Sequence, residues 1–351
     1  TPSRSLHFAK NRACCQLEGS LGENDLASEI MACKINPMKM ENDRIFTRRS
    51  FLTASLIVSD VLFGSSRGRE ALAATVELEP LWGTGVSNLA YVLAASDRHQ
   101  DAEQVIAKFE QRGGSSAVAA RIRADNAGYR GDFSEALRYA FLARARDPGT
   151  PLVNRTLTWN YGVLGFKEQT VAAVRGAPRF VELYWKADLD RLTAEARATG
   201  AAMWKRPDVV AAIDGIAFKR DFALITELYD ANPKRAEICN DYRQSYLPIQ
   251  VAAALQQVGR IQESRSLLDC VRQTLRVETA TQIRSPYLPI NGLELMRAQL
   301  HALEGRPALA FAALDRSIAL GGRTVFGRGL SEFPAFDAYR AEPAYRRDLA
   351  R

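Results

Sequence analysis

The sequence lacks a long apolar run, and this absence argues against a protein with a membrane-spanning helix. Its longest apolar stretch, 51–64, spans about 14 residues and is interrupted by Asp60, whereas a membrane-spanning helix needs about 20. We therefore expect no transmembrane helix. Hydrophobic residues make up 47% of the chain and charged residues 25%, which are ordinary proportions for a folded, water-soluble protein.

The residues and motifs that carry most enzyme chemistry are also scarce. The 351 residues include three histidines, and no phosphate loop, dinucleotide fingerprint, His-Glu metal motif or Gly-x-Ser-x-Gly elbow occurs. One histidine, His301, falls on a predicted helix, where a lone histidine more often packs than catalyses. We therefore expect no enzymatic activity, no catalytic or metal-binding residue and no cofactor.

Neither the cysteines nor the charges indicate a particular partner. The five cysteines form no pair with zinc-ligand spacing, and their odd number argues against a full disulfide framework. The net charge is +7, and 38 of the 47 basic residues are arginine. These charges are dispersed and form no basic stripe interleaved with aromatic residues, so the sequence argues against a nucleic-acid partner.

What the chain does contain is a regular spacing of turns. Three predicted turns, at Asp97-Arg98, Gly131-Asp132 and Gly165-Phe166, lie 34 residues apart. A period of this length, with a glycine-type turn between two helical stretches, is typical of a helical repeat array. Because one such unit cannot bury its apolar face alone, we expect the units to stack and to present a concave surface.

The segment from Ala117 to Thr150 carries the clearest repeat. Its turn is Gly131-Asp132, Ala136 and Ala143 follow it, and Pro148 closes the unit. Glycine permits the turn, alanine allows two helices to approach closely, and proline ends a helix. This segment resembles the tetratricopeptide repeat family. The resemblance implies an all-α, right-handed superhelical solenoid of antiparallel helix pairs, which binds a protein or peptide in its concave groove.

More divergent repeats extend this resemblance to residues 51–322, or about six to seven helix pairs. Further turns are predicted at Gly259 and Gly305, and a further helix pair within 209–229. Residues 1–50 are expected to form a poorly ordered tail, and 323–351 a C-terminal capping segment.

The C-terminal segment suggests an alternative function. Degenerate arrays that end in Phe-Pro-Ala-Phe-Asp, here at 333–337, are similar to the C-terminal sensor halves of some bacterial signalling proteins. That similarity implies a sensor half that has lost its N-terminal output domain. The leading hypothesis remains a protein- or peptide-binding scaffold.

A twin-arginine pattern precedes the repeats, in Thr47-Arg48-Arg49-Ser50-Phe51-Leu52. An apolar stretch and the small-residue site Ala71-Leu72-Ala73 follow it, as in an export signal covering 40–74. Two features oppose export: Asp60 interrupts the apolar stretch, and 56–80 also resembles a first repeat. We therefore predict a cytoplasmic protein, with twin-arginine export through Arg48-Arg49 as the alternative.

The repeat period also selects candidate ligand-binding residues. Arg121 and Arg155 occupy equivalent helix positions, and each lies one helical turn before a second groove position, Asp125 or Trp159. Two arginines placed in this way can clamp a carboxylate or an extended peptide beside an aromatic ring. The alternative is ordinary groove solvation with an ion pair between Arg121 and Asp125 at i,i+4. The ligand-groove hypothesis, with a carboxylate-bearing protein or peptide as partner, rests on Tyr91, Arg121, Asp125, Arg155 and Trp159.

Overall fold

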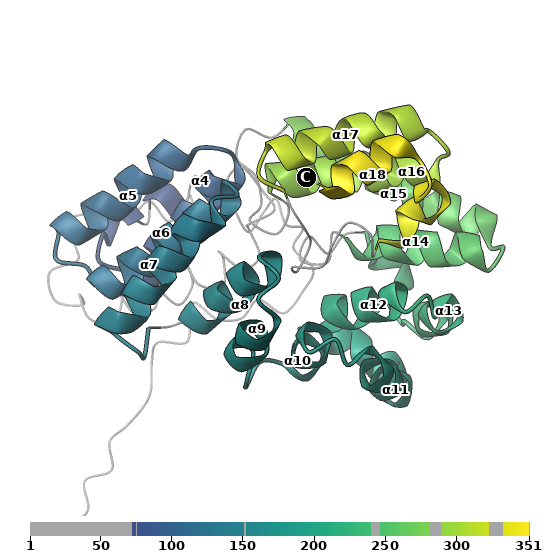
Figure 1. Cartoon of the computed structure of the whole chain (residues 1–351), viewed down its shortest axis with the longest axis horizontal. Coiled ribbons are helices and arrows are strands. Elements are labelled where there is room, and N and C mark those ends of the chain that lie inside the picture. The colour runs from purple at the N-terminus through teal and green to yellow at the C-terminus, as the bar shows by residue number, and fades with distance from the viewer. Residues whose placement is uncertain are drawn as a thin grey trace, which may run out of the picture. The chain divides into compact units, whose positions relative to one another are not determined.

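The computed structural model describes residues 72–74, 76–150, 152–239, 246–280, 289–322 and 333–350, all within one compact unit (Figure 1). Over these ranges the chain is helical and contains no β-strand. The all-α class is therefore confirmed for the described residues. The predicted tail 1–50 lies outside them, as do residues 40–71 of the candidate export signal.

The first described helices follow one another as pairs connected by short turns. They are α4 (Gly83–Ala95) with α5 (His99–Gln111), α6 (Ser116–Tyr129) with α7 (Phe133–Arg146), and α8 (Val153–Val163) with α9 (Lys167–Ala173). The members of each pair pack together, and α6 also packs against α4 and α8 (Figure 1). The three predicted turns are confirmed, with left-handed backbone at Asp97, Gly131 and Gly165 (φ 61°, 80° and 77°).

Small and capping residues explain how the α6–α7 pair forms. The Asp132 side chain caps α7 by accepting a hydrogen bond from the backbone N–H of Glu135 at 3.0 Å, which satisfies a donor that the helix itself leaves unpaired. Ala136 and Ala143 on α7 are fully buried. Alanine at these contacts lets the two helices approach closely, since no larger side chain separates them.

Four further helix pairs complete the array. They are α10 (Arg179–Trp185) with α11 (Leu189–Thr199), α12 (Val209–Phe218) with α13 (Phe222–Asp230), α14 (Leu247–Gln257) with α15 (Ile261–Ala280), and α16 (Ile290–Leu303) with α17 (Pro307–Ala319). The predicted turns at Gly259 and Gly305 are confirmed, with φ of 80° and 72°. One hydrophobic cluster runs from α10 to α16 and holds these pairs together.

The α10–α11 pair was not predicted from the sequence, and its turn residue explains why. Ala187 adopts the left-handed conformation there, with φ of 57°. Residues other than glycine are uncommon in this region of backbone conformation, and Ala187 also lies outside the 34-residue period that marked the turn at Asp97. Two short 3₁₀ segments, η2 (Gly200–Lys205) and η3 (Arg235–Glu237), also interrupt the pattern nearby.

The described ends of the unit pack against the neighbouring pairs. Leu72 and Val76 are buried in a cluster with α4 and α5. At the other end, η6 (Pro334–Tyr339) and α18 (Pro343–Ala350) bury Phe336 and Tyr345 against α16 and α17. Arg220, in the α12–α13 turn, pairs with Asp337 of η6 at 2.6 Å. Within the described ranges, none of the helices combines the length and the apolar character needed to cross a membrane.

Candidate functional site

A cavity of about 900 Å³ lies among the helices, and we treat it as the candidate site. Its wall is formed mainly by residues of α4, α6, α8, α10, α12, α16 and α17, together with the turns at 174–178 and 321–322. Ligand pockets commonly have volumes of about 300–1,000 Å³. The cavity is therefore large enough for a small molecule or for a short stretch of peptide.

Two glycine turns that are far apart in the sequence touch at the edge of this cavity. A Cβ atom added to Gly131 would lie 2.8 Å from the Cα atom of Gly321, so the two backbones are in direct contact. Beside them, the Asn291 side-chain amide donates to the Tyr129 carbonyl oxygen at 3.5 Å and to the Leu320 carbonyl oxygen at 3.4 Å. The α6–α7 turn therefore meets the end of α17 and bounds the cavity on this side.

Asp125 of α6 is the centre of a hydrogen-bond network in the wall. Arg121 Nη1 donates to Asp125 Oδ2 at 2.9 Å, and Thr156 Oγ1 donates to Oδ1 at 2.7 Å. The Tyr91 hydroxyl also donates to this carboxylate. Tyr91 and Asp125 lie 34 residues apart, so equivalent positions of two successive repeats are in contact. Asp125 is therefore occupied by protein groups.

Arg121 is not the exposed groove residue that the sequence predicted. It is only 4% exposed, does not line the cavity, and donates from Nη2 to Ser87 Oγ at 2.9 Å. Burial lowers the pKa of Arg121, and nearby Arg155 acts in the same direction, while Asp125 opposes both. The Arg121 side chain lies between α4 and α6, because its partners Ser87 and Asp125 belong to these two helices. The i,i+4 pair with Asp125, the alternative considered for Arg121, is present.

Arg155 and Trp159 of α8 do lie in the cavity wall, as do Tyr91 and Asp125. The guanidinium carbon of Arg155 lies 6.0 Å from the centroid of the Tyr91 ring. Arg155 is exposed and forms no ion pair within the described residues, because Asp125 is engaged by Arg121. Trp159 is 36% exposed and presents part of its ring surface. This part of the wall thus combines the positive charge of Arg155 with the aromatic rings of Tyr91 and Trp159.

Several cavity residues were missed by sequence reasoning. Arg175 comes from the turn between α9 and α10; it is exposed and forms no ion pair in the described part of the chain. Trp185, Tyr246 and Asn291 line the cavity from segments outside the three evenly spaced repeats. For Arg175 the sequence did offer one signal, the early Pro178 that shortens α9 and places a turn at the wall.

A buried carboxyl group lies behind the wall, on α12. Asp214 is 1% exposed, and neither carboxyl oxygen has a hydrogen-bond partner within the described residues. Burial raises the pKa of Asp214 to about 8, because the charged form loses its hydration. The cavity-lining Tyr246 is close enough that Asp214 adds to the effect of burial and raises the pKa of its hydroxyl. The Asp214 carboxyl is therefore mostly neutral at pH 7.

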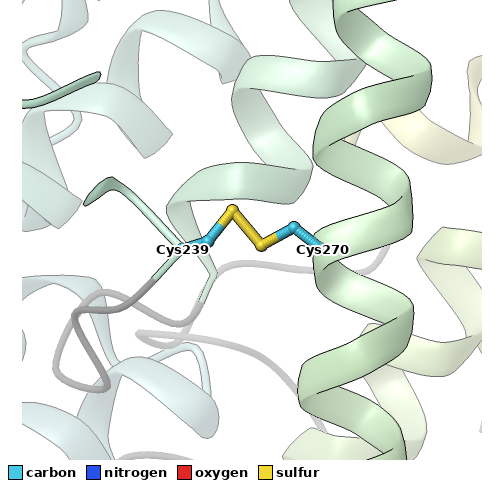
Figure 2. Close-up of a disulfide and its surroundings, with 2 residues drawn as sticks. All are labelled: Cys239 and Cys270. Atoms are coloured by element: carbon cyan, nitrogen blue, oxygen red, sulfur yellow. A yellow bond between two sulfur atoms is a disulfide. The ribbon is translucent and has the colours of Figure 1, made fainter. Parts of the chain in front are cut away.

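A disulfide joins Cys239, just after η3, to Cys270 on α15 (Figure 2). The Cα atoms of the two cysteines lie 6.2 Å apart, and the cysteines are separated by 31 residues in the sequence. Their spacing matches no motif, so the sequence alone could not pair them. The other cysteines, Cys14, Cys15 and Cys33, lie outside the described residues.

The function of this site has to be inferred from its own residues. The sequence matches no protein-family model, and a comparison with curated proteins finds no similar protein.

Proposed function

We propose that the chain is a binding scaffold built as a right-handed, tetratricopeptide-like solenoid, and that its cavity receives a carboxylate-bearing segment of a protein or peptide. The observation that supports this proposal is Arg155, exposed in the cavity wall and without an ion-pair partner among the described residues. An arginine fork can hold a carboxylate through two hydrogen bonds. The role is binding without catalysis or a cofactor.

The neighbouring residues have defined parts in this proposal. Tyr91 and Trp159 supply rigid aromatic surface, which is typical of residues that dominate binding energy. Arg121 and Asp125 act on the ligand indirectly, since Asp125 fixes the Tyr91 hydroxyl and Arg121 compensates the Asp125 charge. With Asp125 compensated in this way, Arg155 and Arg175 leave the wall positive, which favours an anionic ligand.

The double variant Arg155→Gln with Trp159→Ala should weaken partner binding by about 2 kcal/mol, or roughly thirtyfold, because it removes the charge and an aromatic contact together. Partners captured from a lysate by the full chain are identified by mass spectrometry, and the binding of each is then measured by calorimetry. The control is Arg144→Gln, since Arg144 also lies over an aromatic ring, that of Phe141, but outside the cavity.

Thermal melting of the same variants separates binding from folding. Because Arg155 and Trp159 are partly exposed, the double variant should melt within a few degrees of the unaltered protein. Unchanged affinity in a folded double variant would place the binding surface elsewhere. An equal loss in Arg144→Gln would reduce the effect to general charge attraction.

A small effector is the second candidate ligand, in line with the sensor alternative. The contact between Gly131 and Gly321 favours it, because a bounded cavity encloses a compact molecule more readily than a through-going peptide. Mass spectrometry of small molecules released on denaturing the purified full chain distinguishes the two candidates. A stoichiometric small anion would support the effector, and its absence together with a captured protein would support the scaffold.

The disulfide bears on location, and we propose the exported alternative on that basis. Structural disulfides persist in oxidising compartments and are rare in the cytoplasm, where thiols are kept reduced. The bond between Cys239 and Cys270 therefore fits a protein that leaves the cytoplasm better than one that stays there. The twin-arginine pattern at Arg48-Arg49 supplies a route, although it lies outside the described residues.

Residues 40–74 fused to a folded reporter should deliver the reporter outside a bacterial cytoplasm. The change of Arg48 and Arg49 to lysine should abolish delivery, because the pathway reads the arginine pair and not its charge alone. Cell fractionation measures the delivered share. Retention of the unaltered fusion in the cytoplasm would return the protein to the predicted cytoplasmic location. Delivery that survives the double lysine change would show that export does not depend on the arginine pair.

A further inference from the structure

A second concavity, of about 410 Å³, lies between α15 and α16 and shares no lining residue with the first. Its floor is apolar, with Leu275 and Leu300 only 5% and 2% exposed. Two basic residues of α15 and two of α16 surround this floor. The two on each helix are four positions apart and therefore lie on the same helix face. We call these four the basic quartet: Arg272, Arg276, Arg297 and His301.

The first nearby carboxylate, Glu304, is shared among two arginines and a histidine. It contacts Arg272 at 2.5 Å, His301 at 3.4 Å and Arg306 at 3.5 Å. Burial opposes its ionisation, but these contacts, Arg272 foremost, hold the pKa of Glu304 below its ordinary value. Glu304 is therefore ionised and carries one negative charge for three neighbours. The exposed Asp269 adds one further contact to Arg272.

The second carboxylate close to the quartet, Glu294, is shared in the same way. It pairs with Arg297 and also with Arg316, the latter at 2.9 Å. Arg297 Nη2 also donates to Oγ1 of Thr279, on α15, at 2.9 Å. This hydrogen bond holds the Arg297 side chain against α15. Arg276 is exposed and forms no ion pair within the described residues.

These contacts leave the concavity positive. Three arginines line it, and none of the described residues in its lining is acidic. Glu304 and Glu294, which pair with Arg272 and Arg297, are each shared with an arginine outside the concavity. Like charges four residues apart on a helix repel one another and cost stability. An anion held between the two helices would offset this repulsion, so anion binding would stabilise the two helices.

We propose that the basic quartet binds a phosphate group. A phosphate monoester carries a charge of about −1.5 to −2 at pH 7 and offers three strong acceptor oxygens, enough for donors from several arginines. Arginines from two facing helices present planar forks that can donate to different oxygens of one phosphate. The floor of Leu275 and Leu300 is available to an apolar group attached to the phosphate.

The test is calorimetric titration of the full chain with inorganic phosphate and with phenyl phosphate at constant ionic strength. We expect saturable binding with one site per chain, tighter for phenyl phosphate because its ring can cover the leucine floor. Arg276→Gln should weaken binding at least tenfold. The control is Arg265→Gln, which removes another exposed arginine of α15 that does not line the concavity, and which should change affinity less than twofold.

A third arm identifies the source of the phosphate group. Flotation with vesicles that contain phosphatidic acid presents the same group on a lipid, and binding there that depends on Arg276 would assign the site to a headgroup. Circular dichroism checks that each variant is folded, and Arg276→Lys, which keeps the charge, should retain part of the affinity. The proposal is overturned if no probe binds saturably, or if Arg265→Gln weakens binding as much as Arg276→Gln.

Discussion

The free energy of unfolding should fall by up to about 5 kcal/mol between pH 4 and pH 8 through the single side chain of Asp214. In the unfolded chain its pKa is about 3.9, whereas burial raises the pKa in the folded protein to about 8. Between these values the folded protein keeps a proton that the unfolded chain has released. Stability from this group is therefore complete below pH 4, is lost as the pH rises, and changes no further well above pH 8.

The variant Asp214→Asn isolates this effect, because the amide has nearly the same shape and does not ionise. Urea unfolding at pH 5 and pH 8 should show a steep loss in the unaltered protein and a much flatter profile in the variant. Asp190→Asn is the control, since Asp190 has an 89% exposed side chain and its surface ion pair with Lys219 is of small energetic value. Parallel profiles for the unaltered protein and Asp214→Asn would show that Asp214 finds a compensating donor.

Replacement of both Cys239 and Cys270 by serine should lower the free energy of unfolding by about 3–4 kcal/mol. The disulfide closes a loop between residues 31 positions apart, and its removal returns that conformational freedom to the unfolded chain. The variant should still fold, because α15 is also anchored by buried Leu268 and Val271.

The measurement is guanidinium unfolding with and without a reducing agent. The unaltered protein should lose stability on reduction and approach the double serine variant, which should not respond to the reductant at all. Thiol titration of the denatured, unreduced protein reports the state of the pair when it is compared with the double serine variant, because Cys14, Cys15 and Cys33 are present in both. If the unaltered protein does not respond to reduction and both thiols titrate as free, the bond is not formed in solution, and the argument for export loses its support.

The sequence predicted the helix pairs wherever glycine marks the turn. Gly131, Gly165, Gly259 and Gly305 all adopt left-handed backbone at the predicted positions. The turn of the α10–α11 pair was missed, because Ala187 is not a glycine and lies 22 residues after Gly165, outside the 34-residue period that marked the turn at Asp97. Turn chemistry is local and visible in a sequence, whereas a conformation imposed by packing is not.

The candidate site divides in the same way. The 34-residue period placed Tyr91, Arg155 and Trp159 on helix faces that line the cavity. It could not show that Arg121 lies buried between α4 and α6, because a period fixes the direction of a side chain and not its depth. The opposite wall, with Asn291, depends on contacts across more than a hundred residues, to which a local pattern gives no access.

The contact between Gly131 and Gly321 changes how stability is distributed along the chain. In a simple repeat array each unit touches only its neighbours, so the array can fray from either end and its stability is a sum of local terms. Here residues 190 positions apart are in backbone contact, which links the α6–α7 pair to the α16–α17 pair. This contact joins the two ends of the segment from α6 to α17, so the helix pairs between them belong to a closed segment of chain. Loss of either the α6–α7 pair or the α16–α17 pair would therefore deprive the other of a partner, and we expect the pairs from α6 to α17 to unfold more cooperatively than in a simple repeat array.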